Sequence, residues 1–216
     1  FDVVSSPALL RTLVLGGIVL FLLLAAGAGT PVVAPLAALF HASLLHRGPM
    51  LAGPADDVLA VILLCLVVGR SGDDLSVDRL VAGAAAKRPA ASWRTRTALG
   101  LLRVHASAIA AAAVVSQLKA DVWWDGTAAG LLAAREGSLP GAANFLGTST
   151  LLTNLVTHAI TLFEIGFAVG VWPRRTRRAA ALAGIVGWPL VGLLAAEPAW
   201  GAAMAILAVA CLPDAE

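Results

Sequence analysis

Charged side chains are scarce in this chain of 216 residues. Asp, Glu, Lys and Arg together make up 13% of it, whereas hydrophobic residues make up 59%. A soluble domain typically carries about 25% charged residues, so the shortage argues against an ordinary soluble protein and favours a membrane protein. The formal net charge of +2 is small. Because no basic helix is interleaved with aromatic residues, nucleic acid is not an expected partner.

Cysteine is also scarce. Cys65 and Cys211 each lie inside an apolar run, where a thiol behaves as a small hydrophobic group. The sequence has no CxxC or HExxH, so neither a disulfide framework nor a metal site is expected. The histidines show no metal-ligand spacing; they are His41, His46, His105 and His158. The motifs of serine hydrolases, phosphate-binding loops and dinucleotide sites are missing too.

Long apolar runs are what the sequence has in abundance. A helix that crosses a bilayer needs about 20 mostly apolar residues. The runs that approach this length are 8–28, 31–46, 57–70, 97–117, 150–172, 179–196 and 198–212. We therefore expect an all-α, polytopic transmembrane helical bundle of about seven spans (six to eight), forming a single domain over residues 1–216. The first residue is Phe1 rather than methionine, so we expect a processed or truncated N-terminus.

Turn-forming and polar residues separate the apolar runs. Short surface helices are expected at 76–86 and 126–136. Pro54 with Asp56 or Asp57 marks a helix start, because an acidic side chain there accepts from free backbone N–H groups. Pro189 inside the sixth run predicts a kink.

Arginine and lysine set the expected orientation, because they are enriched in short cytoplasmic loops. Residues 71–96 and 174–178 hold most of the basic side chains outside the apolar runs. We therefore place these two loops in the cytoplasm and the loop 119–149 on the outward side.

The fifth run carries a polar face. Asn154, Thr157, Thr161 and Glu164 follow helical spacing, and His158 borders them. Polar groups within a span normally point into the bundle, because exposure to lipid is costly. This pattern has two interpretations: a hydrogen-bonding stripe that holds helices together, or a polar pocket for a ligand or proton.

Lys119, Asp121 and Asp125 lie where the fourth run ends, beside two tryptophans. One interpretation is an interfacial anchor, because tryptophan favours the membrane surface and lysine extends its charge into water. The other is the edge of an active site, in which partial burial would turn the lysine or a carboxylate into a usable base.

Four stretches together resemble one family. They are "SLLHRGPMLAGPADD", "GDDLSVDRL", "LLRVHASAIAAAAVVSQLKADVWWDG" and "FEIGFAVGVWPRRTRRAAALAGIVGW". In order and spacing they resemble the HTTM domain, over residues 43–212. HTTM domains are bacterial relatives of the transmembrane part of vitamin K-dependent gamma-glutamyl carboxylase, and include proteins that mature a sporulation-delaying toxin. The resemblance implies a multi-pass protein of the bacterial inner (plasma) membrane.

The resemblance also implies quinol chemistry, in which a lysine within a "KKL" step of the carboxylase acts on vitamin K hydroquinone. The corresponding step here reads Ser116-Gln117-Leu118. Gln117 cannot act as a base. The carboxylase also uses a histidine that would fall near Ala55 to Asp56, where this chain has none.

These observations leave three hypotheses for function. The first is a non-catalytic or accessory subunit that packs against other membrane-protein subunits and the lipid bilayer, with a quinone, lipid or pigment as the candidate cofactor. The second is a membrane-embedded enzyme or maturation factor acting on a quinol, lipid or secreted peptide. Its candidate residues are Lys119, Asp121, His158 and Glu164, with Asp121 or Glu164 as base and Lys119 orienting an anion. The third is a small transporter. The loss of the expected base favours the first.

Overall fold

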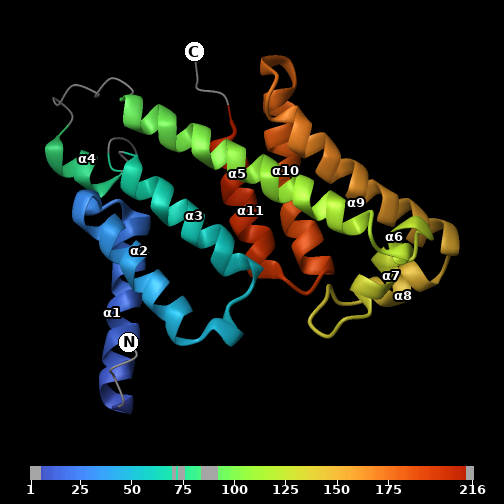
Figure 1. Cartoon of the computed structure of the whole chain (residues 1–216), viewed down its shortest axis with the longest axis horizontal. Coiled ribbons are helices and arrows are strands. Elements are labelled where there is room, and N and C mark those ends of the chain that lie inside the picture. The colour runs from blue at the N-terminus through green and yellow to red at the C-terminus, as the bar shows by residue number, and fades with distance from the viewer. Residues whose placement is uncertain (1–5, 70–71, 73–75, 84–91, 213–216) are drawn as a thin grey trace. The chain divides into compact units, whose positions relative to one another are not determined.

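The computed structural model describes residues 6–69, 72, 76–83 and 92–212, and every regular element within them is helical (Figure 1). The all-helical fold predicted from the apolar runs is therefore confirmed for this part of the chain. In chain order the elements are α1 (Pro7–Ala26), α2 (Thr30–Arg47), the 3-10 helix η1 (Pro49–Leu51), α3 (Pro54–Val68), α4 (Val77–Ala82), α5 (Trp93–Gln117), α6 (Asp121–Trp124), α7 (Ala128–Ala133), α8 (Ala142–Gly147), α9 (Thr150–Gly170), α10 (Arg174–Leu194) and α11 (Pro198–Ala210).

The helices divide into two compact units, and the boundary between them in the sequence falls within α5. Unit 1 comprises residues 1–101 and unit 2 comprises residues 102–216. Unit 1 holds α1 to α4 and the start of α5, and unit 2 holds the rest of α5 and α6 to α11. The single domain over the whole chain stays a prediction.

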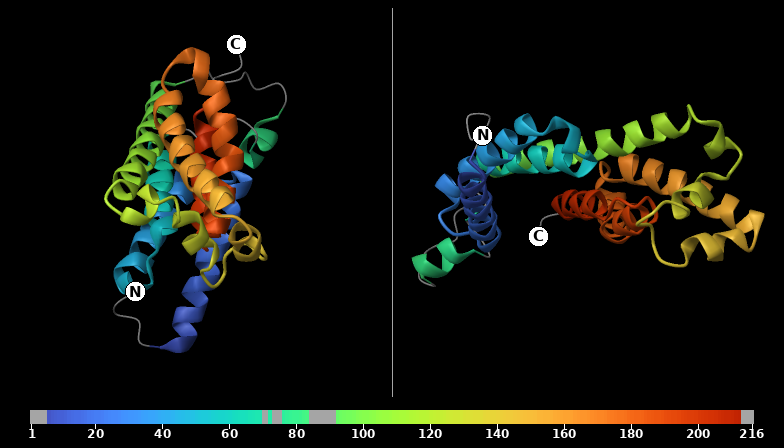
Figure 2. Two further views of the ribbon diagram at one scale, coloured as in Figure 1. Left: turned by 90° about the vertical axis from the view of Figure 1, so that its right-hand side faces the viewer. Right: turned by 90° about the horizontal axis from the view of Figure 1, so that it is seen from below.

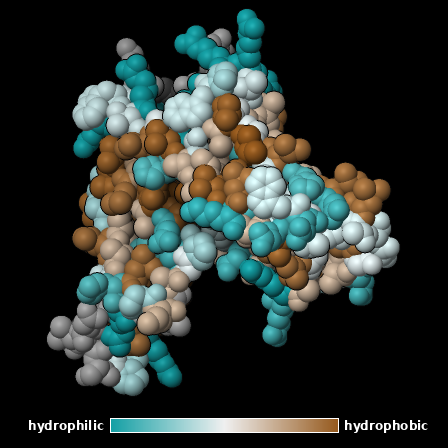
Figure 3. All heavy atoms as spheres, turned by 45° about the vertical axis from the view of Figure 1, so that its right-hand side comes forward, coloured by the Kyte–Doolittle hydropathy of each residue, from teal (hydrophilic) through white to brown (hydrophobic). Residues whose placement is uncertain are grey.

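In the described part of the chain, four helices are long and apolar enough to cross a membrane: α1, α5, α9 and α10. They correspond to the runs predicted at 8–28, 97–117, 150–172 and 179–196. Large apolar side chains are exposed on each of these helices, and Figure 3 shows hydrophobic residues over much of one face of the molecule. Leu162 of α9 is 68% exposed, for example. Such faces suit contact with lipid tails, which replace water around a spanning helix.

The other three predicted spans are also helical and correspond to α2, α3 and α11. They are not among the four helices of the described residues that are long and apolar enough to cross a membrane. The helix α2 has 18 residues and contains two histidines and an arginine, whereas α3 has 15 residues and α11 has 13. The structure therefore supports four spans, and a count of about seven stays a proposal.

The basic stretch 174–178 was expected to be a loop, and this expectation is wrong. The helix α10 begins at Arg174, directly after Pro173, whose backbone is extended (φ −70°, ψ 138°). Arginine is a good helix former, so the basic residues supply the first turns of α10. Only a short turn then separates α9 from α10.

The predicted surface helices are present but differ in extent. The helix expected at 126–136 is α7, which is shorter, and α6 and α8 flank it on either side. The helix expected at 76–86 is α4, which ends at Ala82; residues 84–86 lie outside the described part of the chain.

In unit 1, Asp78 of α4 caps the start of α2. Its carboxylate accepts the backbone N–H groups of Gly29 (2.7 Å) and Thr30 (3.0 Å) and the Thr30 hydroxyl (3.1 Å). The free N–H groups and the positive end of the helix dipole favour an anion at this position. The hydrogen bonds that the ionised carboxylate accepts hold the pKa of Asp78 below its usual value. The short helix α4 is thereby fixed to the α1–α2 turn.

The α1–α2 contact depends on a glycine. A Cβ at Gly17 would lie 2.0 Å from the ring of Phe40, so only glycine allows this approach. Phe40 in turn meets Phe21 edge to face, with ring centroids 6.3 Å apart. Small residues at such crossings let helix backbones come close, which is how spanning helices usually associate.

In unit 2, α10 packs against both α9 and α11 (Figure 2). At the α10–α11 crossing the backbones nearly touch, since a Cβ at Gly192 would lie 2.7 Å from the Cα of Gly201. Beside this crossing, Trp188 of α10 is fully buried. Its ring meets Phe163, Phe167 and Trp200 edge to face, with centroids 5.0–5.4 Å apart. This aromatic cluster ties the three helices together.

The segment that holds α6, α7 and α8 is anchored to the end of α10. Leu139 donates its N–H to the Leu193 carbonyl (3.1 Å), and the Ser138 hydroxyl donates to the Leu194 carbonyl (2.8 Å). A small apolar core joins α7 to α8; it consists of Ala129, Ala133, Ala142 and Leu146. The segment is therefore an ordered part of unit 2.

Candidate functional site

The polar face of α9 points inward, as its spacing predicted. Thr157 is fully buried and Glu164 is 2% exposed, while Asn154 and Thr161 are half-buried. Because these residues lie on one side of a spanning helix, their polar groups avoid lipid and meet partners within unit 2.

The partner of Glu164 is Gln117, the last residue of α5. The Gln117 amide nitrogen donates to Glu164 Oε2 at 2.6 Å, and the amide oxygen accepts from the Thr161 hydroxyl at 2.8 Å. Gln117 is 7% exposed, so both ends of a buried amide have partners on α9. A buried amide with both ends bonded meets the requirement that buried polar groups be paired. The three side chains form what we call the Gln117 clamp.

Thr157 lies on α9 one turn before Thr161, and it forms hydrogen bonds with the turn that follows α6. Its hydroxyl oxygen lies 2.9 Å from the carbonyl oxygens of both Gly126 and Thr153, and it accepts the Ala129 N–H at 3.0 Å. A hydroxyl group has one donor and two lone pairs, so it can satisfy donor and acceptor roles together. Thr157 therefore fixes the start of α7 against α9.

Asn154 adds a second contact to the same turn. In the amide orientation that satisfies both of its ends, its nitrogen donates to the carbonyls of Gly126 (2.9 Å) and Thr150 (3.2 Å). Gly126 has φ +73°, a left-handed conformation that favours glycine, and a Cβ there would lie 2.6 Å from the Asn154 side chain. The turn and the polar face of α9 are thus fitted to each other.

Three of the four candidate catalytic residues lie apart from this face. Lys119, Asp121 and His158 are exposed, whereas Glu164 is buried. Glu164 comes six residues after His158, which is about 600° around the helix and places the two on different faces. The structure therefore brings Glu164 together with Gln117 and Thr161 rather than with the other candidates.

Lys119 follows the end of α5 and does not continue that helix. The chain turns there, with Lys119 N–H bonded to the Ser116 carbonyl (3.3 Å) and Ala120 N–H to the Gln117 carbonyl (3.0 Å). Next to it, Trp124 donates its indole N–H to the Leu118 carbonyl at 3.0 Å. An exposed lysine beside an exposed tryptophan has the pattern of an interfacial anchor.

Sequence reasoning identified Gln117 only as a replaced base and missed its role as a partner of Glu164. The available signal was a polar amide at the end of an apolar helix, which must find a partner if it is buried. The aromatic cluster around Trp188 was missed as well, because its members come from three different helices and helical spacing does not show which side chains of separate helices meet.

The structure has a pocket in each unit. One, in unit 1, is lined by residues of α1 and α2 and by the start of α3. Another, in unit 2, includes Asn154, Thr153 and Gly130. Neither of these two includes any of the four candidate catalytic residues. Within the described ranges, no three His, Cys, Asp or Glu side chains come together as metal ligands could.

No protein-family model matches this chain, and neither curated proteins nor solved structures give a significant match. The resemblance to the HTTM domain therefore stays a prediction that depends on the quoted motifs.

Proposed function

We propose that this chain is an integral protein of the bacterial plasma membrane, built like an HTTM domain with about seven spans, that serves as a non-catalytic accessory subunit. Four apolar helices with lipid-suited outer faces support the membrane location. In this proposal α2, α3 and α11 complete the spans within the assembled bundle, and the basic residues of 71–96 and 174–178 lie on the cytoplasmic side.

The Gln117 clamp is the observation that carries the accessory role. The position at which the HTTM resemblance calls for a catalytic lysine holds an amide, and both ends of that amide bond to α9. A glutamine amide is too weak a base to take a proton from a substrate, and this one is held by hydrogen bonds to α9. At this position the chain holds two helices together.

An alanine-rich face of α5 offers a surface for another helix. Val104, Ala108, Ala112 and Val115 follow helical spacing and are all exposed. Ala108 and Ala112 are four residues apart, which is the small-xxx-small pattern that lets helices approach closely in lipid. This face supports packing against a second membrane protein.

The test is extraction of the full chain from its membrane in polymer-bounded native nanodiscs, followed by size analysis and mass spectrometry of whatever accompanies it. We expect a complex with at least one other membrane protein. Ala112→Leu should reduce the yield of that complex, because the larger side chain separates the helices. Ala159→Leu is the matched control, since Ala159 is exposed on α9. A chain that runs alone in every native extract would contradict the accessory role.

A membrane-embedded enzyme or maturation factor is the second candidate, and the buried carboxyl of Glu164 favours it. Ionisable groups inside a membrane domain often mark functional sites. Glu164→Gln distinguishes the two. In the accessory role this variant keeps the complex and leaves secreted peptides and membrane quinols unchanged. In the enzymatic role it removes a product at an unchanged protein level, which mass spectrometry of cells with each variant would detect.

A further inference from the structure

Unit 1 contains a cavity of about 400 Å³ with one apolar side. The N-terminal half of α1 and the last turns of α2 supply that side, through Leu10, Val14, Leu44 and Leu45. The volume falls within the range of small-molecule sites. One of the two helices that supply this wall, α1, is long and apolar enough to span a membrane.

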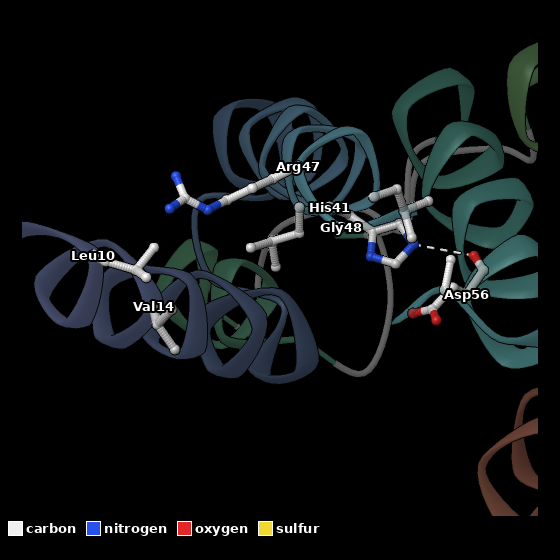
Figure 4. Close-up of a pocket in the computed structure, with 9 residues that line it drawn as sticks. Leu10, Val14, His41, Arg47, Gly48 and Asp56 are labelled. Carbon is white, nitrogen blue, oxygen red and sulfur yellow. Dashed lines mark hydrogen bonds between the residues drawn. The ribbon is translucent and has the colours of Figure 1, made fainter. Parts of the chain in front are cut away.

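One end of the cavity presents hydrogen-bond acceptors. His41 Nε2 is 3.0 Å from the Asp56 carbonyl oxygen, as Figure 4 shows. A ring nitrogen next to a carbonyl carries the proton, so in the neutral ring Nδ1 is an acceptor, and it points away from Asp56 (Figure 4). The Asp56 carboxylate accepts the Gly53 N–H through Oδ2 at 2.8 Å. A carboxylate has about four acceptor sites, so it can also accept from a ligand.

The other end presents a cation. Arg47, the last residue of α2, lines the same cavity. Figure 4 shows its guanidinium on the side of α1, away from Asp56. Guanidinium groups match phosphate oxygens in a two-pronged geometry and bind them more strongly than neutral donors do. One cavity thus combines an acceptor-rich end, a cationic end and an apolar wall.

We propose that this cavity binds a phospholipid whose headgroup ends in a primary ammonium, that is, a phosphatidylethanolamine. The phosphate bonds to Arg47, the ammonium donates to the Asp56 carboxylate, and an acyl chain lies along the four apolar side chains. We choose this headgroup because Arg47 and Asp56 carry opposite charges, which complement the phosphate and the ammonium of a zwitterionic lipid. An anionic headgroup would meet the Asp56 carboxylate, and a trimethylammonium group has no N–H to donate.

The lipid site is independent of the accessory role. It depends on residues of unit 1 alone, whereas the Gln117 clamp and the alanine-rich face lie in unit 2. A chain without protein partners could still hold the lipid, and a subunit of a complex could lack it.

The experiment measures lipid retention by native mass spectrometry of the full chain, released from nanodiscs of phosphatidylethanolamine, phosphatidylcholine or phosphatidylglycerol with the same acyl chains. We expect one phosphatidylethanolamine to remain bound and the other two lipids to dissociate. Asp56→Asn and Arg47→Gln should each reduce retention about tenfold, because each removes a charge-assisted hydrogen bond. Asp57→Asn should leave retention unchanged. It makes the same charge change at the next residue, which is exposed and does not line the cavity.

Two further arms keep the result decisive. The Asp56→Asn side chain can still accept the Gly53 N–H, so circular dichroism should show that this variant is folded. If it is not folded, Leu44→Trp replaces it in the test: the larger side chain fills the cavity and should also abolish retention. Soluble glycerophosphoethanolamine should not raise the melting temperature, since it lacks the acyl chain. Equal retention of the three lipids, retention unaffected by Asp56→Asn and Arg47→Gln, or a quinone in place of lipid would overturn the proposal.

Discussion

Gln117 and Glu164 lie 47 residues apart in the sequence, and the amide of one donates a 2.6 Å hydrogen bond to the carboxyl of the other. The same amide accepts from Thr161. A single side chain at the end of α5 thus forms hydrogen bonds with two polar groups of α9. These bonds explain how a glutamate is accommodated inside an apolar helix.

Replacing Gln117 with leucine should destabilise unit 2. The substitution leaves the buried Glu164 carboxyl without its partner, and an unpaired buried polar group costs about 1–3 kcal/mol. It also removes the stronger of the two hydrogen bonds of the Thr161 hydroxyl, which keeps the Thr157 carbonyl at 3.5 Å. We expect the free energy of unfolding to fall by about 2–4 kcal/mol, measured by denaturant unfolding in detergent micelles. Ser116→Ala, at the exposed neighbouring position, is the control and should have little effect. Equal stability of the two variants would show that the hydrogen bonds contribute nothing.

Acid should weaken the attachment of α4 to α2. The folded-state pKa of Asp78 is lowered by the N–H groups of Gly29 and Thr30. Its contribution to stability is therefore fully present above the unfolded value of about 3.9 and is lost as pH falls through the lower, folded-state pKa. Below about pH 4, the wild-type chain should lose melting temperature more steeply than Asp78→Asn, whose amide does not titrate. Parallel pH profiles for the two proteins would contradict this role of Asp78.

Two helical glycines should respond oppositely to alanine. At Gly192 a Cβ would lie 2.7–2.9 Å from the backbone of α11, so Gly192→Ala should lower the free energy of unfolding by about 1–3 kcal/mol through overpacking. At Gly166 a Cβ would meet nothing within 4 Å, so Gly166→Ala should raise it by about 0.5–1 kcal/mol by restricting the unfolded chain. Denaturant unfolding of both variants measures the difference. A loss at both positions would show that the outer face of α9 is also packed.

The exposed candidates should tolerate neutral replacement. Lys119→Gln, Asp121→Asn and His158→Gln each change a side chain on the surface, where substitutions usually alter stability by less than about 0.5 kcal/mol. In the accessory role none of them should change the yield of the native complex or the profile of secreted peptides. Loss of a product in any one of them, with the complex intact, would instead support the enzymatic role.

Some features of the fold follow from the sequence because they depend on local pattern. The length of the apolar runs predicts α1, α5, α9 and α10, since a bilayer imposes a minimum length on a helix. Helical spacing predicts that Thr157 and Glu164 share a face, and the cost of exposing them to lipid predicts that this face is buried. The start of α3 at Pro54 follows from capping preferences.

The start of α10 was harder to infer, because arginines suit both a cytoplasmic loop and the first turns of a helix. Only the structure shows that the helix begins at Arg174. Local composition does not distinguish the two states when a residue type is favourable in both.

A helical protein with spans long enough for a membrane, and with a buried polar stripe on one of them, can be predicted from the order of residues alone. The partners of individual residues become visible only in the folded chain: Gln117 for Glu164, Gly201 for Gly192, and Asp56 for His41. Helical periodicity specifies which side of a helix is buried. Which residue of another helix that side meets depends on how the side chains of several helices fit together, and that information is spread over the whole chain.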